Sequence, residues 1–149
     1  MDINKLTNKN LVNLNLKGNT KKEVLKEMIE LFEKENRITS ADKFYKTILA
    51  REEEGTTGLG RGIAIPHGKS ESVKELTLAV GRSNQGIDYN SLDNQPVHLI
   101  FMVADYKGYS PGYLKMVSKL VSKLRIDEYR NSLIKSEKET EVIKIIQQL

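Results

Sequence analysis

One of the two histidines of this chain, His67, lies in the stretch GLGRGIAIPHGKSES (58–72), directly between a proline and a glycine. Pro66 has a fixed φ and favours an extended conformation at Ile65, so we expect the imidazole where an extended segment ends. Gly68 leaves room for a second molecule to approach. The upstream glycines can direct amide N–H groups at an anion. Because neutral imidazole is a nucleophile near pH 7, the pattern indicates a histidine that accepts and passes on a phosphoryl group.

Other functions of a glycine-rich stretch fit these residues poorly. A dinucleotide-binding fingerprint would need glycine at positions 58, 60 and 63, but position 63 is Ile. The fingerprint should also follow a strand, whereas a helix is expected before this glycine-rich stretch. The full P-loop pattern is absent as well. The chain has no cysteine, which excludes disulfides, thiolate catalysis and cysteine-ligated zinc, and two distant histidines support a metal site poorly. We therefore expect neither a metal nor a cofactor.

The composition predicts one soluble domain over residues 1–149. Hydrophobic residues make up 38% of the chain and charged residues 30%. No apolar run approaches the roughly 20 residues that span a bilayer, and the polar N-terminus lacks the apolar core of a signal peptide, so we expect a cytoplasmic protein without direct membrane insertion. The net charge is +4, but basic and acidic residues alternate in stretches such as KKEVLKEMIELFEKENR, which is typical of a solvated helix face. Nucleic acid is therefore not an expected partner.

The elements around the histidine predict an α/β fold with helices at both ends of the chain and a central sheet. Thr20 begins a helix with a capping box, and a second helix opens at Thr39 and Asp42 and closes at Gly55. After the glycine-rich loop, ELTLAVGRS alternates as a half-buried strand, with Leu76, Leu78 and Val80 on one face, and PVHLIFMVA is a strand buried on both faces.

Three helices are expected after the second strand. Ser110 is the predicted cap of the first, with Pro111 in its first turn. A short helix covers about 127–135. The last begins at about 137, capped by Ser136 with Glu139 three residues later.

The stretch LAREEEGTTGLGRGIAIPHGKSESV (49–73) closely resembles the active-site segment of enzyme IIA proteins of the sugar phosphotransferase system, fructose/mannitol class. The resemblance extends over nearly the whole chain, and PVHLIFMVA is more similar to the fructose branch. It implies a mixed β-sheet flanked by helices. It also implies a phosphotransferase in which His67 accepts phosphate from the phosphocarrier protein HPr and passes it to a cysteine of a IIB component, and through IIB to sugar uptake by a membrane IIC component. The resemblance places Arg51 beside the phosphohistidine, where a guanidinium can stabilise phosphoryl oxygens.

The sequence departs from this family at one expected site residue. Many members carry a second active-site histidine at the start of the helix after the buried strand, where this chain has Tyr113, and no histidine occurs from 99 to 149. Tyr113 is either a phenolic donor to the phosphoryl group or a simple packing residue on the apolar face of its helix. His98 lies within the buried strand, and we expect it to be a core or sheet-end histidine with a satisfied hydrogen bond. Some members also carry an acidic residue where this chain has Arg61.

The missing histidine keeps a second function open. Some relatives of this fold control partners by phosphorylation-dependent binding rather than by feeding sugar uptake, and this chain is either such a regulator or a transport component. The sequence does not name the sugar.

Overall fold

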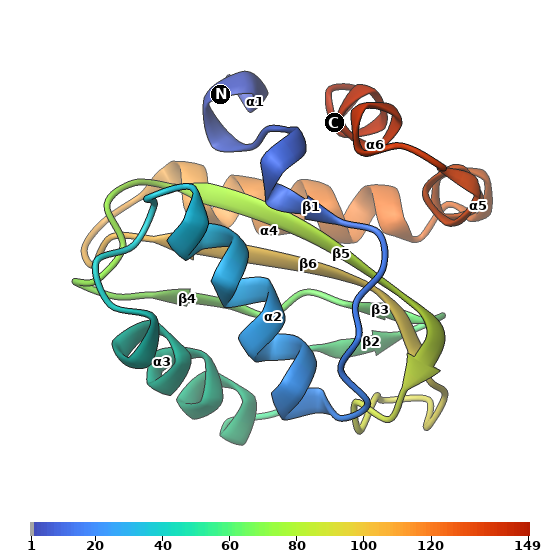
Figure 1. The fold of residues 1–149 in the computed structure, drawn as a ribbon, viewed down its shortest axis with the longest axis horizontal. Helices are drawn as coiled ribbons and strands as arrows, with labels where there is room; N and C mark the ends of the chain where they lie inside the picture. The colour runs from blue at the N-terminus through green and yellow to red at the C-terminus, as the bar shows by residue number, and fades with distance from the viewer. Residues whose placement is uncertain (1) are drawn as a thin grey trace.

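The computed structural model describes residues 2–149 and arranges them in three layers, with one sheet between two layers of helices (Figure 1). Two helices cover one face: α2 (Lys21–Lys34) and α3 (Ala41–Glu53). Four helices lie on the other: α1 (Ile3–Leu6), α4 (Pro111–Leu124), α5 (Asp127–Lys135) and α6 (Glu139–Ile146). Within residues 2–149, no helix has the length and apolar character needed to cross a bilayer.

The sheet is mixed, as the resemblance implied. Its six strands are β1 (Val12–Asn13), β2 (Gly58–Gly60), β3 (Ile63–Ala64), β4 (His67–Lys69), β5 (Thr77–Ile87) and β6 (Val97–Asp105). The spatial order is β1-β5-β6-β3-β2, and β4 also pairs with β6. Strands β3 and β4 follow each other along one edge of β6, both parallel to it, while β5 is antiparallel along the other edge. The buried strand β6 is therefore the frame on which the segment containing His67 is aligned.

Burial on the two sheet faces follows the predicted alternation. The side chains of Leu78 and Val80 on β5, and of Leu76 just before it, pack on the face of the sheet that α4 covers. The side chain of Ala79 packs on the opposite face, under α2 and α3. Nearly every residue of β6 is buried. The predicted placement of Leu76, Leu78 and Val80 on one face and the burial of β6 on both faces are confirmed. Strand β5 is itself buried on both faces from Thr77 to Gly81.

The glycine-rich stretch forms a β-hairpin, where the sequence predicted a loop. Strands β2 and β3 pair antiparallel, and the tip is formed by Gly60, Arg61 and Gly62 at φ values of 101°, 57° and 78°. Positive φ is accessible to glycine at little cost, which explains the flanking glycines. At Gly58 a Cβ would lie 2.5 Å from Oγ of Ser91, so only glycine allows this close approach.

The N-terminal segment contains structure that the sequence did not reveal. Helix α1, a 3₁₀ turn η1 (Lys9–Leu11) and β1 precede α2. Each is four residues or shorter, too short to show a hydrophobic period, and each is held by tertiary burial of residues such as Leu11. The side-chain amide of Gln147 donates to the side-chain oxygen of Asn4 at 2.8 Å, which joins the two ends of the chain (Figure 1).

Two of the predicted helix starts are confirmed. The hydroxyl of Thr20 accepts the N–H of Glu23 at 3.2 Å at the start of α2. At the start of α4 the hydroxyl of Ser110 accepts the N–H of Tyr113 at 3.4 Å, and Pro111 is the first helical residue.

Two predicted helix caps are wrong in detail. Ser40, not Thr39, caps α3, whereas Gly55 closes this helix as predicted, directly after the C-cap Glu54 and at a φ of 151°. Ser136 does not cap α6: it ends α5, and its hydroxyl donates to the carbonyl oxygen of Ser132 at 2.8 Å. Because that hydroxyl is turned back into α5, α6 begins only at Glu139, without a side-chain cap.

We predict that Phe44→Ala lowers the free energy of unfolding by about 3–5 kcal/mol, because it leaves a cavity under α3. Phe44 is fully buried and packs edge-on against Phe32 of α2, with ring centroids 5.8 Å apart. Urea unfolding followed by circular dichroism measures the change. The matched control is Lys46→Ala, at an exposed position of the same helix, which should stay within about 0.5 kcal/mol of the wild type. A loss below 1 kcal/mol for Phe44→Ala would contradict the packing described here.

Candidate active site

His67 is the first residue of β4, immediately after a break in the strand at Ile65 and Pro66. The carbonyl oxygen of Pro66 still accepts the N–H of Val103 on β6 at 3.0 Å, so the break does not detach the chain from the sheet. The sequence predicted His67 at the point where an extended segment ends, whereas the structure places it at the start of the next short strand. Side chains alternate along β4, so His67 and Lys69 lie half-buried on one side while Gly68 is buried on the other.

The imidazole of His67 is held by one backbone hydrogen bond. Its Nδ1 lies 2.7 Å from the carbonyl oxygen of Ile65. A carbonyl oxygen can only accept, so we assign the proton of the neutral ring to Nδ1, which leaves the lone pair on Nε2. Burial lowers the pKa of His67 below its ordinary value, and the positive charge of Arg51 adds to this, while the hydrogen bond to Ile65 and the charge of Glu52 oppose it. The ring is therefore mostly neutral at pH 7, with a nucleophilic Nε2.

Arg51 and His67 lie in the same open depression, of about 570 Å³. Arg51 occupies the last turn of α3, and its guanidinium donates to the carbonyl oxygen of Gly55 at 2.9 Å. Helix α3 packs so tightly on β4 that a Cβ at Gly68 would lie 2.9 Å from Cγ2 of Thr47. The glycine after the histidine therefore admits a helix of this chain, where the sequence suggested only room for another molecule.

Tyr113 lies in the first turn of α4 and also lines the depression. Its ring meets that of His67 edge-on, with centroids 6.0 Å apart. Burial raises the pKa of Tyr113 to about 12, against the opposing charge of Arg51, so the phenol stays protonated at neutral pH. The structure thus brings the three predicted site residues together from α3, β4 and α4.

Sequence reasoning missed two features of the site. Lys69 shares the face of β4 with His67 and reaches the ring of Tyr113, with Nζ 4.9 Å from its centroid. Its spacing of two from the histidine was the available signal. Glu52 is the other: its side chain is only 5% exposed and pairs with Lys21 at 2.8 Å.

The carboxylate of Glu52 also accepts the backbone N–H and the hydroxyl of Thr57, which in turn contacts the hydroxyl of Tyr89 at 3.0 Å. These contacts fix the segment after α3, where Gly55 holds Arg51. Glu52 is followed by two exposed glutamates, and the sequence pattern did not indicate which of the three is buried.

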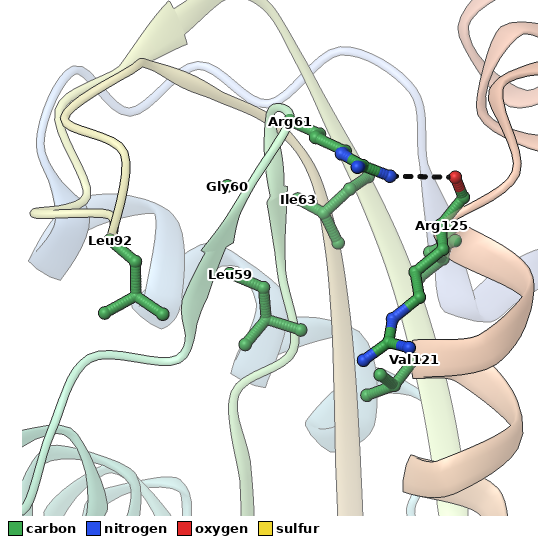
Figure 2. A pocket seen from close by; sticks show the side chains of 8 residues that line it. Leu59, Gly60, Arg61, Ile63, Leu92, Val121 and Arg125 are labelled. Carbon is green, nitrogen blue, oxygen red and sulfur yellow. Dashed lines mark hydrogen bonds between the residues drawn. The ribbon is translucent and has the colours of Figure 1, made fainter.

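The tip of the β2–β3 hairpin contributes to a different cleft. This cleft, of about 510 Å³, lies between the hairpin, Leu92 and the end of α4, and Figure 2 shows Arg61 reaching across to Arg125. The guanidinium of Arg61 donates to the carbonyl oxygen of Arg125 at 3.0 Å. Gly60 thus lines this second cleft and not the depression around His67, so it does not form the anion cradle beside the imidazole that the sequence suggested.

The second histidine has a structural position. His98 is the second residue of β6, and its Nδ1 lies 2.9 Å from the carbonyl oxygen of Ser83 on β5. It is therefore a sheet-end histidine with a satisfied hydrogen bond. Across residues 2–149 no group of three or more His, Asp or Glu side chains is arranged to hold a metal ion.

We predict that His67 makes the free energy of unfolding fall as the pH drops from about 7.5 to 5.5. Its pKa in the folded protein is lowered, so below the ordinary value of 6.5 the unfolded chain binds more protons than the folded one, and protonation favours unfolding. Urea unfolding of wild type and His67→Asn across this range isolates the contribution, because all other groups are shared. On acidification, the free energy of unfolding should fall more in the wild type than in the variant. A greater fall in the variant would show that the pKa of His67 is not lowered in the folded protein.

The chain matches the family model described as "Phosphoenolpyruvate-dependent sugar phosphotransferase system, EIIA 2" over residues 5–149. It is 39% identical over 148 residues to the fructose-specific EIIABC component of the Bacillus subtilis phosphotransferase system. That match covers 99% of this chain but only 23% of the relative, so the chain spans about a quarter of that protein's length.

Two examples represent the solved structures that are similar to this chain. The nitrogen regulatory protein IIA-Ntr of Neisseria meningitidis is 31% identical, with a TM-score of 0.90 over 97% of this chain and 98% of the other. The mannitol enzyme IIA of Escherichia coli, determined in complex with phosphorylated enzyme IIB, is 18% identical, with a TM-score of 0.81 over 96% and 98%. The family match extends over almost all of the sequence, and the first of these structures matches 97% of the chain at 31% identity: the chain belongs to the EIIA type 2 family of the phosphoenolpyruvate-dependent sugar phosphotransferase system.

Proposed function

We propose that this protein is a phosphocarrier in which His67 accepts a phosphoryl group from phospho-HPr and passes it to a cysteine of a IIB component. The observation that carries the proposal is the tautomer of His67: the Ile65 carbonyl holds the proton on Nδ1, and Nε2 is left as the nucleophile in a depression that also contains Arg51. Family membership supports the same role.

In the first step, the Nε2 lone pair attacks the phosphorus of the donor phosphohistidine. A bond forms between Nε2 and phosphorus, and the bonding electrons of the old N–P bond return to the donor imidazole. In the second step, the thiolate of the IIB cysteine attacks phosphorus and the electrons of the new N–P bond return to Nε2. Neither step requires a redox change, and the proton stays on Nδ1 throughout, donated to the carbonyl oxygen of Ile65.

The positive charge of Arg51 acts on the phosphoryl oxygens during both steps. Negative charge is spread over these oxygens as the N–P bond breaks, and a preorganised guanidinium stabilises it. The hydrogen bond to the carbonyl oxygen of Gly55 anchors Arg51 at the depression, and the ion pairs formed within residues 2–149 do not include Arg51.

The proposed physiological role is sugar uptake of the fructose type, which the similarity to a fructose-specific relative favours. The IIB partner is supported by the mannitol enzyme IIA that was determined in complex with phosphorylated IIB. A regulatory role is the second candidate, favoured by the TM-score of 0.90 to a nitrogen regulatory protein. Transfer to a IIB cysteine distinguishes the two, because only the uptake role requires it.

We predict that phosphoenolpyruvate, enzyme I and HPr together label His67 with a phosphoryl group that is acid-labile and alkali-stable. Mass mapping locates the adduct, and His67→Ala should abolish it. His98→Ala is the matched control and should be labelled like the wild type. Label on His98, or labelling that survives His67→Ala, would overturn the proposal.

We predict that Arg51→Ala slows phosphoryl transfer by about 10²–10³-fold, the range for loss of one preorganised donor to developing negative charge. Arg51→Lys should recover only part of the rate, because an ammonium group lacks the planar fork of a guanidinium. Single-turnover transfer from HPr and to IIB measures both changes. If Arg51→Ala folds normally and transfers phosphate at the wild-type rate, Arg51 has no such role.

A further inference from the structure

Besides Arg51, two lysines line the depression that contains His67: Lys107, an exposed loop residue, and Lys69, a residue of β4. It lies two residues after the histidine on β4, so both side chains leave the strand on the same side. Its ammonium group lies over the ring of Tyr113, which itself meets the ring of His67 edge-on. Lys69, Tyr113 and His67 therefore form one contiguous group.

The positive charge of Lys69 is not neutralised by an ion pair. The ion pairs formed by residues 2–149 do not include it. Asp105 is its register partner on β6, and one carboxylate oxygen of Asp105 is buried without a hydrogen-bond partner. The ammonium group does not form an ion pair with Asp105 and instead donates to the carbonyl oxygen of Gly108 at 2.6 Å. A backbone carbonyl is a neutral acceptor that an anion can displace.

The negative charge of a phosphoryl group on His67 would attract the ammonium group of Lys69. A phosphoryl group on Nε2 carries close to two negative charges at neutral pH. Tyr113 remains a neutral phenol there, so it contributes at most one neutral hydrogen bond. Arg51 supplies one positive charge from the α3 side. Of the two lysines that line the depression, Lys69 is the one whose ammonium group lies over the Tyr113 ring beside His67.

We propose that Lys69 is a catalytic residue: its ammonium group leaves the Gly108 carbonyl and binds a phosphoryl oxygen of phosphorylated His67, opposite Arg51. This inference rests on the proposed function of His67. Lysine suits the movement, since its ammonium is a compact charge on a flexible stem of four carbons. Phosphorylation then also frees the segment around Gly108 from its contact with β4. The loop between β6 and α4, with exposed Tyr106 and Tyr109, thus differs between the two states.

The test compares Lys69→Met with Lys107→Met in single-turnover transfer from HPr. Both variants remove one positive charge from the same depression, but Lys107 is an exposed loop residue. We expect Lys69→Met to slow transfer by about 10–100-fold, the range for a lost charge-assisted hydrogen bond, and Lys107→Met to slow it less. Lys69→Arg keeps the charge and should retain most of the rate, which also serves if Lys69→Met fails to fold.

A nuclear magnetic resonance measurement separates a phosphoryl contact from a structural role. The peptide group that contains the Gly108 carbonyl also contains the N–H of Tyr109, so the Tyr109 amide resonance reports the Lys69 contact. It should shift when wild-type protein is phosphorylated and stay nearly constant in Lys69→Met. If wild type is labelled at His67 but Lys69→Met transfers at the wild-type rate, or loses no more than Lys107→Met, the lysine inference is wrong while the phosphocarrier proposal stands. If wild type takes no label at His67, both fall.

Discussion

The close approach of α3 to β4 at Gly68 is the constraint on which the geometry of the site depends. A single methyl group there would meet the side chain of Thr47, so α3 would have to move away from the sheet. Arg51 is carried on the last turn of that helix, whereas His67 is fixed to the sheet through the Pro66 carbonyl. The separation between the guanidinium and the imidazole is thus set by packing between a helix and a strand, which interiors hold within narrow limits.

Two further contacts convert this packing into a defined site. The edge-on contact between Phe44 and Phe32 fixes α3 against α2. The buried carboxylate of Glu52 holds the segment that follows α3. Arg51 and Glu52 are neighbours in sequence but lie in different environments. The guanidinium of Arg51 lines the depression. The carboxylate of Glu52 is buried among Lys21, Thr57 and Tyr89. Their effects on the pKa of His67 oppose each other, and burial of the ring has the largest effect.

The sequence was most informative where long periodic segments or a distinctive local pattern existed. The long helices α2, α3 and α4 and the strand β5 were predicted from the regular spacing of their apolar residues, and β6 from its continuous apolar run. His67 stood out through its proline and glycine neighbours. Arg51 needed the family resemblance, because a lone arginine at a helix end is commonly solvent-facing. The short elements before residue 14 and the hairpin at the glycines depend on tertiary contacts such as those of Leu11 and Ser91, which leave no local signal. The start of α6 was mispredicted because the hydroxyl of Ser136 bonds back to the carbonyl oxygen of Ser132. Glu52 also lacked a local signal, whereas the spacing of Lys69 from His67 was a signal that went unused.

The partner of Nδ1 in His67 has a consequence for how this protein tolerates mutation. The acceptor is the main-chain oxygen of Ile65, which every amino acid at that position would supply. A codon change can remove Arg51, Lys69 or Tyr113, but none at position 65 deletes a carbonyl, so the orientation and tautomer of the imidazole are insulated from single substitutions there. Sequence drift around the depression can therefore exchange the groups that surround a bound anion, while the nitrogen that attacks it remains the same.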